Sequence, residues 1–222
     1  MRLLVTGATG LVGAEVIRQS LADADIEKVT ALVRRPLATT HAKLTTVVHD
    51  DFLHYDAVLP QLAGHDACLW CLGVSQRDVD EAEYIRITRD YAVAGAAAML
   101  HANPRLTFGF LSGAGASSTE RSWLLFGRVK GQTENRLGEL GLPHLYHFRP
   151  GYIEPSEPRP HVRFEERLFA PLTPLLHRLL PGSLITSTDL ARAMIHVVKH
   201  GAGRRILDNT ALRRLAHLAA KQ

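Results

Sequence analysis

The chain has 222 residues, of which 46% are hydrophobic and 22% are charged. This length and composition are typical of one globular domain, and a chain of this size can fold without a metal ion or a disulfide framework. The formal net charge of +4 is compatible with an anionic ligand. It is too small to predict nucleic-acid binding, and we expect no nucleic-acid partner.

The sequence does not predict a membrane span or export. It contains no long apolar run without charges. Glycines interrupt the apolar residues at the N-terminus and Glu15 follows, so the pattern of a signal peptide is missing. Cys68 and Cys71 are too few for a disulfide framework. We therefore expect a reducing, cytoplasmic location.

Strand-like and helix-like stretches alternate up to about residue 150, which is typical of a parallel sheet flanked by helices. Helical spacing is expected at residues 11–21, and the alanine-rich residues 84–101 also favour a helix. Residues 122–140 favour a third helix, with Gly141 as its C-terminal cap. The expected strands are residues 2–6, 29–33, 44–48, 67–72, 106–111 and 144–148.

The composition changes after Arg149. Residues 154–160 are rich in proline and indicate a loop or an extended crossing segment. Residues 187–200 form an amphipathic helix with Ser187 or Thr188 as the N-cap, followed by a short strand at 205–207 and a terminal helix at 210–220. We expect one domain over residues 1–222, with a cofactor-binding core at 1–153 and a small C-terminal cap on the substrate side at 154–222.

Residues 161–180 carry many apolar side chains and two prolines. We expect this segment to form a lid or to pack in the core; an oligomer contact and a membrane-touching patch are the alternatives. Its two internal prolines argue against one long membrane-surface helix. The apolar residues are Phe164, Leu168, Phe169, Leu172, Leu175, Leu176, Leu179 and Leu180.

The most specific motif is a glycine-rich turn between the first strand and the first helix, at residues 6–13. Gly7 allows the tight turn, Gly10 allows the backbone to approach a pyrophosphate, and Gly13 allows the helix to pack closely on the sheet. The helix N-terminus then offers free N–H groups to phosphates. The expected cofactor-binding residues of this turn are Gly7, Thr9, Gly10, Leu11 and Val12.

The end of the second strand carries two arginines, Arg34 and Arg35, where an acid would bind the ribose of NAD. Guanidinium groups can hold a 2′-phosphate, so we expect NADP(H) to be preferred over NAD(H). Asp51, rather than Asp50, is expected to accept a hydrogen bond from the adenine amino group. Leu72 and Gly73 are expected to line the adenosine side.

Several motifs resemble the short-chain dehydrogenase/reductase superfamily in its atypical branch, and within it the Tat-interacting-protein-like oxidoreductases. The likeness covers about residues 1–153 and fades after Glu154. It implies a Rossmann-type α/β fold with a doubly wound, mostly parallel sheet. The motifs are the glycine-rich turn, the arginine pair, Gly64-His65-Asp66, Cys71-Leu72-Gly73, Arg89-Asp90-Tyr91, Leu111-Ser112, Val129-Lys130-Gly131 and Phe148-Arg149-Pro150-Gly151.

The resemblance implies a catalytic Ser–Tyr–Lys group, in which serine polarises a carbonyl, tyrosine transfers the proton and lysine holds the ribose and lowers the tyrosine pKa. Ser112 and Lys130 match the family's serine and lysine, but Phe126 occupies the tyrosine position. A phenyl ring has no proton to transfer, and losing such a group commonly removes about 10²–10⁴ in rate. Tyr152 is the first candidate for a substitute hydroxyl, because residues 149–153 are expected to run past the nicotinamide. Pro150 is expected to contact the cofactor there.

Two functions from different classes remain open. The first is a weak or specialised oxidoreductase that moves hydride between nicotinamide and a small carbonyl or alcohol. The second is an NADP(H)-binding regulatory or scaffold protein without turnover. The substrate is unknown in either case, and an oligomer is possible.

Other candidate sites are weaker. Cys68 and Cys71 have C-x-x-C spacing but lie on an expected buried strand, so we interpret them as core residues. His196 and His200 are four residues apart without a third ligand, and we predict no metal site. The basic C-terminus is expected to be solvated, with a nucleic-acid or partner surface as the alternative. Its arginines are Arg204, Arg205, Arg213 and Arg214.

Overall fold

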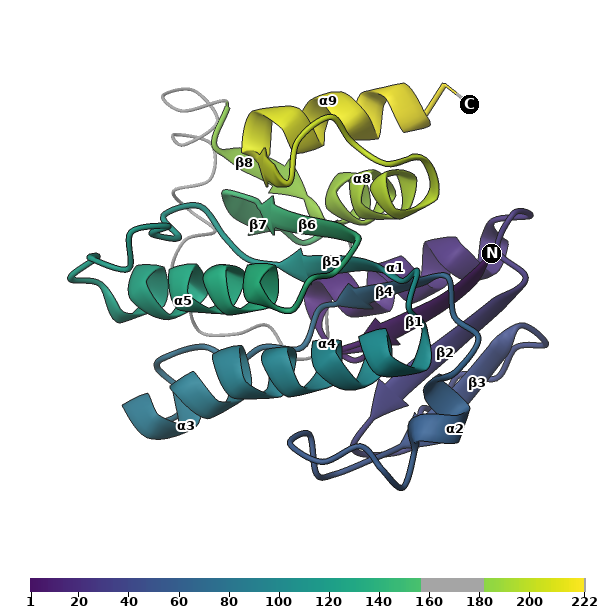
Figure 1. Cartoon of the computed structure of the whole chain (residues 1–222). Coiled ribbons are helices and arrows are strands. Elements are labelled where there is room, and N and C mark those ends of the chain that lie inside the picture. The colour runs from purple at the N-terminus through teal and green to yellow at the C-terminus, as the bar shows by residue number, and fades with distance from the viewer. Residues whose placement is uncertain (157–181, 222) are drawn as a thin grey trace.

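A computed structural model describes residues 1–156 and 182–221, and the predictions for the apolar segment 161–180 lie outside these described residues. The described residues form a seven-stranded sheet in the order β3-β2-β1-β4-β5-β6-β9, and every neighbouring pair is parallel. The strand order reverses between β1 and β4, so the sheet is doubly wound, as the sequence predicts (Figure 1).

The strands follow the expected positions closely, and the differences are at their ends. The expected strand at 67–72 ends at Trp70, and the strand at 144–148 extends to Arg149. The strands of the main sheet are β1 (Arg2–Thr6), β2 (Lys28–Val33), β3 (Leu44–Val48), β4 (Ala67–Trp70), β5 (Thr107–Leu111), β6 (His144–Arg149) and β9 (Ile206–Asp208).

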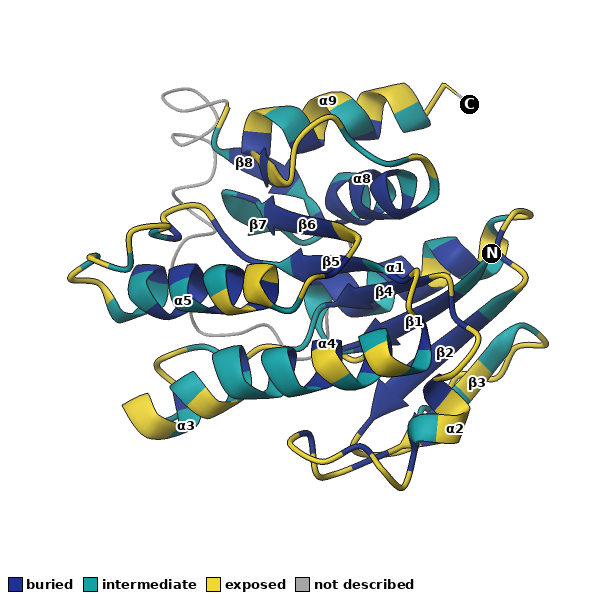
Figure 2. Cartoon of the chain, viewed as in Figure 1, coloured by how far each residue is buried: buried dark blue, intermediate teal, exposed yellow. Residues whose placement is uncertain are grey.

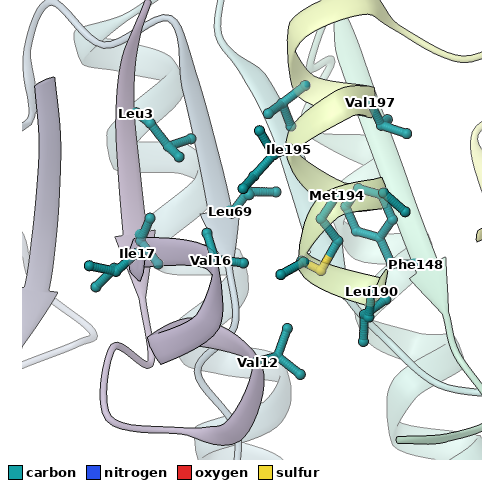
Figure 3. Close-up of a cluster of buried hydrophobic side chains, with 14 of the residues drawn as sticks. Leu3, Val12, Val16, Ile17, Leu69, Phe148, Leu190, Met194, Ile195 and Val197 are labelled. Carbon is teal, nitrogen blue, oxygen red and sulfur yellow. The ribbon is translucent and has the colours of Figure 1, made fainter. Parts of the chain in front are cut away.

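One face of the sheet is covered by α1 (Leu11–Ala22), α8 (Ser187–His200) and α9 (Asn209–Ala219). Val12, Val16 and Ile17 lie on the buried side of α1, as their helical spacing predicts. Figure 3 shows these side chains beside Met194 and Ile195 of α8 and the sheet residues between them. The first and last thirds of the chain therefore share one hydrophobic core.

The opposite face is covered by α2 (Leu59–Leu62), α4 (Tyr91–Ala102) and α5 (Leu125–Glu139). Trp70, Phe108 and Phe110 of the central strands are fully buried beneath these helices. Burial on both faces is visible in Figure 2 and is the reason that the central strands read as continuous apolar runs.

The helix expected at 84–101 consists of three parts. It begins as α3 (Glu81–Ile85), passes through a π-helical turn at Arg86–Asp90 and continues as α4. The side chain of Asp80 caps α3 by accepting a hydrogen bond from Glu83 N. The prediction for 122–140 was wrong at its start, because residues 122–124 form a loop and α5 begins at Leu125.

The described C-terminal residues, 182–221, contribute to the main sheet and to the hydrophobic core. Strand β9 pairs with β6 in the main sheet, and α8 packs on α1. A separate parallel pair, β7 (Tyr152–Glu154) with β8 (Leu184–Thr186), was not predicted. The N-cap of α8 is Thr186, which accepts from Asp189 N, so the predicted caps Ser187 and Thr188 were each wrong.

Within the described ranges, no helix has both the length and the apolar character needed to cross a membrane.

Candidate functional site

The glycine-rich turn joins β1 to α1 with little space for side chains. Gly7 has a φ of +68°, and a Cβ there would lie 2.5 Å from the carbonyl oxygen of Cys71. A Cβ at Gly13 would lie 2.2 Å from the Gly7 oxygen. Both glycines are therefore required by the close approach of backbone to backbone.

Gly10 differs from the other two glycines of the turn. Its φ is −77°, and a Cβ there would meet only the Gly7 oxygen, at 3.1 Å, among the described atoms. Gly10 is also the N-cap of α1, which has no acidic residue in its first turn. No described side chain caps this helix, so its first N–H groups are open to an anion. The chemistry of this turn fits a dinucleotide pyrophosphate, and Thr9, Leu11 and Val12 flank Gly10 in the turn.

Arg34 and Arg35 follow β2 at the same edge of the sheet, and both are exposed. Neither forms an ion pair with any residue in the described ranges. Asp51 is also exposed, and its carboxylate accepts hydrogen bonds from Leu53 N at 3.1 Å and from His54 Nδ1 at 2.8 Å. The hydrogen bond from His54 lowers the pKa of Asp51, so this carboxylate stays ionised.

Leu72 and Gly73 lie in the loop after β4, beside the glycine-rich turn. The hydroxyl of Thr6 accepts a hydrogen bond from Leu72 N at 3.2 Å, which ties the end of β1 to the loop after β4. A Cβ at Gly73 would meet no described atom within 4 Å. This loop therefore borders the turn on its β4 side and has open space beside it.

Helix α5 carries residues of the expected catalytic group on one of its faces. Phe126, Lys130 and Glu134 are spaced four residues apart and so share one face of α5. A Cβ at Gly113 would lie 2.6 Å from Cζ of Phe126, so the phenyl ring covers the backbone directly after Ser112. The ring and the glycine are complementary in shape.

The loop before α5 is held tightly on this helix. A Cβ at Gly131 would lie 1.8 Å from the Ser117 oxygen, and a Cβ at Gly127 would lie 2.6 Å from the Gly115 oxygen. Asn135 donates from Nδ2 to the Ser118 oxygen and to the Glu120 carboxylate. Backbone packing against two helical glycines thus fixes the loop that leads to the reaction side.

The hydroxyl of Ser112 points to a buried carboxylate. Ser112 Oγ donates to Glu134 Oε1 at 2.5 Å, and the two residues are only 7% and 4% exposed. Arg149 donates to the same carboxylate from Nε at 2.9 Å and also from Nη2, which in addition donates to Ser118 Oγ. The ion pair and the three hydrogen bonds satisfy a buried charge that would otherwise be costly.

Lys130 is buried at the ends of β4 and β5. Its Nζ donates to the Leu111 oxygen at 2.8 Å and lies 4.6 Å from the centroid of the Phe110 ring. Burial lowers the pKa of Lys130 to about 8, although the nearby Glu134 carboxylate and the Cys71 thiol raise it. An amine with this pKa exchanges protons readily near neutral pH.

Tyr152 and Pro150 follow β6 toward the second, two-stranded sheet. Tyr152 begins β7, its N–H donates to the Ser183 oxygen, and the side chain is half-buried. Pro150 is buried, and its carbonyl oxygen accepts from Ala114 N at 2.7 Å. Both residues lie after the carboxyl end of β6, and Pro150 contacts the loop that carries Ser112.

Sequence reasoning missed the polar residues behind Ser112. Arg149 was noted only as part of a motif and a composition change, and Glu134 was not noted. The spacing of Glu134 from Lys130 was the available signal, because it places a carboxylate on the same face of α5. His147, also missed, is buried on β6 with no described partner for Nδ1, and burial lowers its pKa to about 4.

The weaker candidates have no assigned chemistry in the structure. Cys68 is buried, Cys71 is half-buried, and both are free thiols. Burial raises the pKa of both, to about 12 for Cys71, as expected for core cysteines. The rings of His196 and His200 lie 4.7 Å apart. Within the described ranges, no three His, Cys, Asp or Glu side chains are arranged to hold a metal ion.

Comparison with known proteins gives the same assignment as the glycine-rich turn. A sequence model of the NAD(P)H-binding family matches residues 7–137, which is more than half of the chain. Protein HTATIP2 of Rattus norvegicus is 29% identical over 216 residues, which cover 95% of this chain and 87% of that protein. Protein FMP52, mitochondrial, of Eremothecium gossypii is 28% identical over 179 residues, covering 80% of this chain and 78% of that protein.

Solved structures show the same fold at low identity. The Bordetella bronchiseptica enzyme WbmF in complex with NAD+ has a TM-score of 0.70 and 15% identity, covering 99% of this chain and 77% of that chain. MoeE5 in complex with UDP-glucose and NAD has a TM-score of 0.69 and 16% identity, covering 100% of this chain and 81% of that chain. The chain belongs to the NAD(P)H-binding family, and its similarity to HTATIP2 agrees with its resemblance to the atypical short-chain dehydrogenases/reductases.

Proposed function

We propose that this chain binds NADP(H) in preference to NAD(H) and acts as a weak or specialised oxidoreductase on a small carbonyl or alcohol. The observation that carries the proposal is the open N-terminus of α1 at Gly10, with two exposed arginines following β2 at the same edge. The helix end matches the charge of a diphosphate. The guanidinium groups match the additional phosphate on the adenosine ribose.

The preference for NADP(H) rests on Arg34 and Arg35. Both side chains are exposed, and neither has an ion-pair partner among the described residues, so both can bind a phosphate without breaking an existing contact. An acidic residue at this strand end would instead repel the 2′-phosphate. Asp51, Leu72 and Gly73 would contact the adenosine in either dinucleotide.

On the reaction side, Ser112, Lys130 and Tyr152 are the proposed functional residues, with Pro150 beside the nicotinamide. The bound dinucleotide would supply or accept the hydride. Lys130 would hold the nicotinamide ribose, since Nζ has three N–H groups and the Leu111 oxygen accepts only one of them. The apolar ring of Phe126 beside Gly113 favours a substrate that is itself apolar next to its carbonyl.

A second function, NADP(H) binding without turnover, is favoured by one specific contact. The Ser112 hydroxyl already donates to Glu134, and Phe126 offers no proton. A regulatory or scaffold protein would need only the glycine-rich turn and the arginines. The two functions share cofactor binding and differ only in whether NADPH is oxidised.

A titration of purified protein with NADPH and NADH, followed by nucleotide fluorescence, tests the shared part. We expect the unaltered protein to bind NADPH more tightly than NADH. Arg34→Ala should weaken NADPH binding by about 10- to 100-fold, because a charged hydrogen bond is worth about 1.5–3 kcal/mol. NADH binding should change little. Arg105→Ala, an exposed arginine just before β5 at the opposite edge, is the matched control. Equal affinity for the two nucleotides in the unaltered protein would overturn the NADP(H) preference.

The second part is tested by NADPH oxidation with a panel of small aldehydes and ketones. Turnover by the unaltered protein supports the oxidoreductase. Phe126→Tyr should then raise the rate, because a phenol at this position restores the family's proton donor. Tight NADPH binding with no oxidation by either protein would instead support the regulatory or scaffold function.

A further inference from the structure

We propose that Lys130 itself donates the substrate proton in this chain, in place of the tyrosine that Phe126 replaces. The inference rests on the proposed oxidoreductase function and adds to it a residue role, since the resemblance implies for this lysine only ribose binding and an effect on a tyrosine. The inference starts from the side chains of α5 that lie near the ends of β4 and β5.

The first argument is position. Lys130 is one helical turn after Phe126 on the same face of α5, so it is the polar group next to the missing phenol. Its Nζ donates at 2.8 Å to the carbonyl oxygen of Leu111, and this peptide group leads directly into Ser112. The ammonium is therefore held at the serine that the family uses to orient a carbonyl.

The second argument is the direction of the other polar groups. The Ser112 proton is donated to Glu134, so Ser112 presents lone pairs to the site rather than a proton. Arg149 donates to the same carboxylate and keeps a guanidinium proton under all ordinary conditions. Among the described residues bonded at this end of β5, Lys130 is the group that carries a transferable proton.

The third argument is electrostatic environment. Lys130 is 9% exposed, and the face of the Phe110 ring lies against Nζ. The titratable groups that face it are Glu134 from α5 and Cys71 from the end of β4. Burial outweighs both groups, so the pKa of Lys130 falls to about 8. A general acid works best when its pKa is close to the working pH.

The proposed step is balanced. In reduction, a bound NADPH would supply the hydride to the carbonyl carbon, and Lys130 Nζ would donate a proton to the carbonyl oxygen, so that the alcohol forms and the lysine becomes a neutral amine. Water then returns a proton to the amine. Oxidation of an alcohol is the same sequence reversed, with the neutral amine accepting the proton.

The first experiment separates binding from turnover, with 4-nitrobenzaldehyde as the probe. Lys130→Arg keeps a positive charge but cannot release a proton, so NADPH affinity should stay within about 5-fold while the rate of NADPH oxidation falls by about 10²-fold or more. Lys43→Arg is the matched control. Lys43 lies just before β3, and its Nζ also donates to a backbone oxygen, that of Asp23, at 2.8 Å. The control should change neither quantity.

The second experiment needs no variant. Competitive labelling with acetic anhydride, analysed by mass spectrometry, gives the pH at which the Lys130 amine loses its proton, with and without NADPH. We expect a midpoint near pH 8 and protection by NADPH. The oxidation rate of the unaltered protein should fall above the same pH. A midpoint above pH 10, or a rate that does not follow the labelling curve, would overturn the proposal.

The third experiment is a rescue. If Lys130→Arg is inactive because it cannot release a proton, Phe126→Tyr in the Lys130→Arg background should restore oxidation, because the phenol supplies a proton and the arginine keeps the positive charge beside the ribose. Tyr152→Phe distinguishes the two candidate proton donors. A Tyr152→Phe variant that removes the pH dependence would assign the proton to Tyr152. Unaltered protein that binds NADPH but does not oxidise it with this aldehyde would also overturn the role of Lys130, while cofactor binding would stand.

Discussion

The carboxyl edge of the sheet has two halves that are built in different ways. The dinucleotide half consists of the glycine-rich turn at 7–13 with Arg34 and Arg35, and its fit depends on backbone: two glycines have no room for a Cβ, and a helix end is left open. The reaction half consists of Ser112, Phe126, Lys130, Glu134 and Arg149, and its chemistry depends on which way side chains point.

This difference separates what the chain can bind from what it can catalyse. The resemblance implies that Phe126 replaces a proton donor, and such a change of one side chain leaves the backbone of the glycine-rich turn in place. In the reaction half the Ser112 hydroxyl and the Glu134 carboxylate bond to each other, which stabilises the fold and also fixes the serine's proton. The dinucleotide half has no such internal pairing at its arginines among the described residues.

The largest effect on stability is expected from Glu134→Ala in the reaction half. The change leaves the Arg149 guanidinium, whose side chain is 17% exposed, without its carboxylate and leaves the Ser112 hydroxyl without its acceptor. We expect the free energy of unfolding to fall by about 3–5 kcal/mol in urea titrations. Glu139→Ala, which breaks an exposed pair with Arg136, should cost less than about 1 kcal/mol. Equal losses for the two variants would show that the buried network contributes no more than a surface pair.

His147 should make the same region sensitive to acid. Burial lowers its folded pKa to about 4, Glu134 opposes that shift, and Arg149 and Arg205 add to it. Protonation therefore favours the unfolded chain, in which the pKa is about 6.5. The stability from keeping His147 neutral is complete above pH 6.5 and is lost progressively as the pH falls toward 4, by up to about 3 kcal/mol.

His147→Phe should make the free energy of unfolding fall less steeply between pH 6.5 and pH 4, as followed by circular dichroism during urea unfolding. His101→Phe, at an exposed histidine of α4, serves as the control and should leave the slope unchanged. Parallel pH profiles for the unaltered protein and His147→Phe would show that other groups cause the acid sensitivity.

The dinucleotide half could be predicted from sequence because its signals are local. Gly7, Gly10 and Gly13 lie within seven consecutive residues, and their spacing between a strand and a helix already specifies the turn. The parallel strands could also be predicted, since burial on both faces makes each one a short apolar run. The three-residue strands β7 and β8 carry no such run and were missed.

The reaction half could be predicted only in part, because its contacts join residues distant in sequence. Ser112 and Lys130 were found by resemblance, but the direction of the Ser112 hydroxyl depends on Glu134, 22 residues away. The contact of α8 with α1 joins the two ends of the chain, as in the bond from Thr188 to Glu15 across 173 residues. Amphipathic spacing shows that a helix is buried on one side, and it does not show against which partner.

A smaller effect on stability, of about 1–3 kcal/mol, is expected from Gly13→Ala in the dinucleotide half. Its new Cβ would lie 2.2 Å from a backbone oxygen, so α1 must shift away from β1. Gly10→Ala has a favourable φ and only one close contact, so it should cost no more than about 1 kcal/mol. It should nevertheless weaken NADPH binding by about tenfold or more, because its methyl group points to the open space where a diphosphate would lie. Normal NADPH affinity in Gly10→Ala would show that the diphosphate does not bind at this turn.

The smallest effect is expected at Asp51, and it separates adenine contacts from phosphate contacts. Asp51→Asn should weaken the binding of NADPH and of NADH equally, by about 2- to 5-fold. Both nucleotides contain the adenine amino group that would donate a hydrogen bond to the Asp51 carboxylate. Arg34→Ala should affect NADPH alone, so the ratio of the two affinities distinguishes the roles. His54→Ala is the control, since it removes the hydrogen bond to the Asp51 carboxylate at 2.8 Å without changing that carboxylate. A selective loss of NADPH in Asp51→Asn would mean that this residue acts on the arginines rather than on adenine.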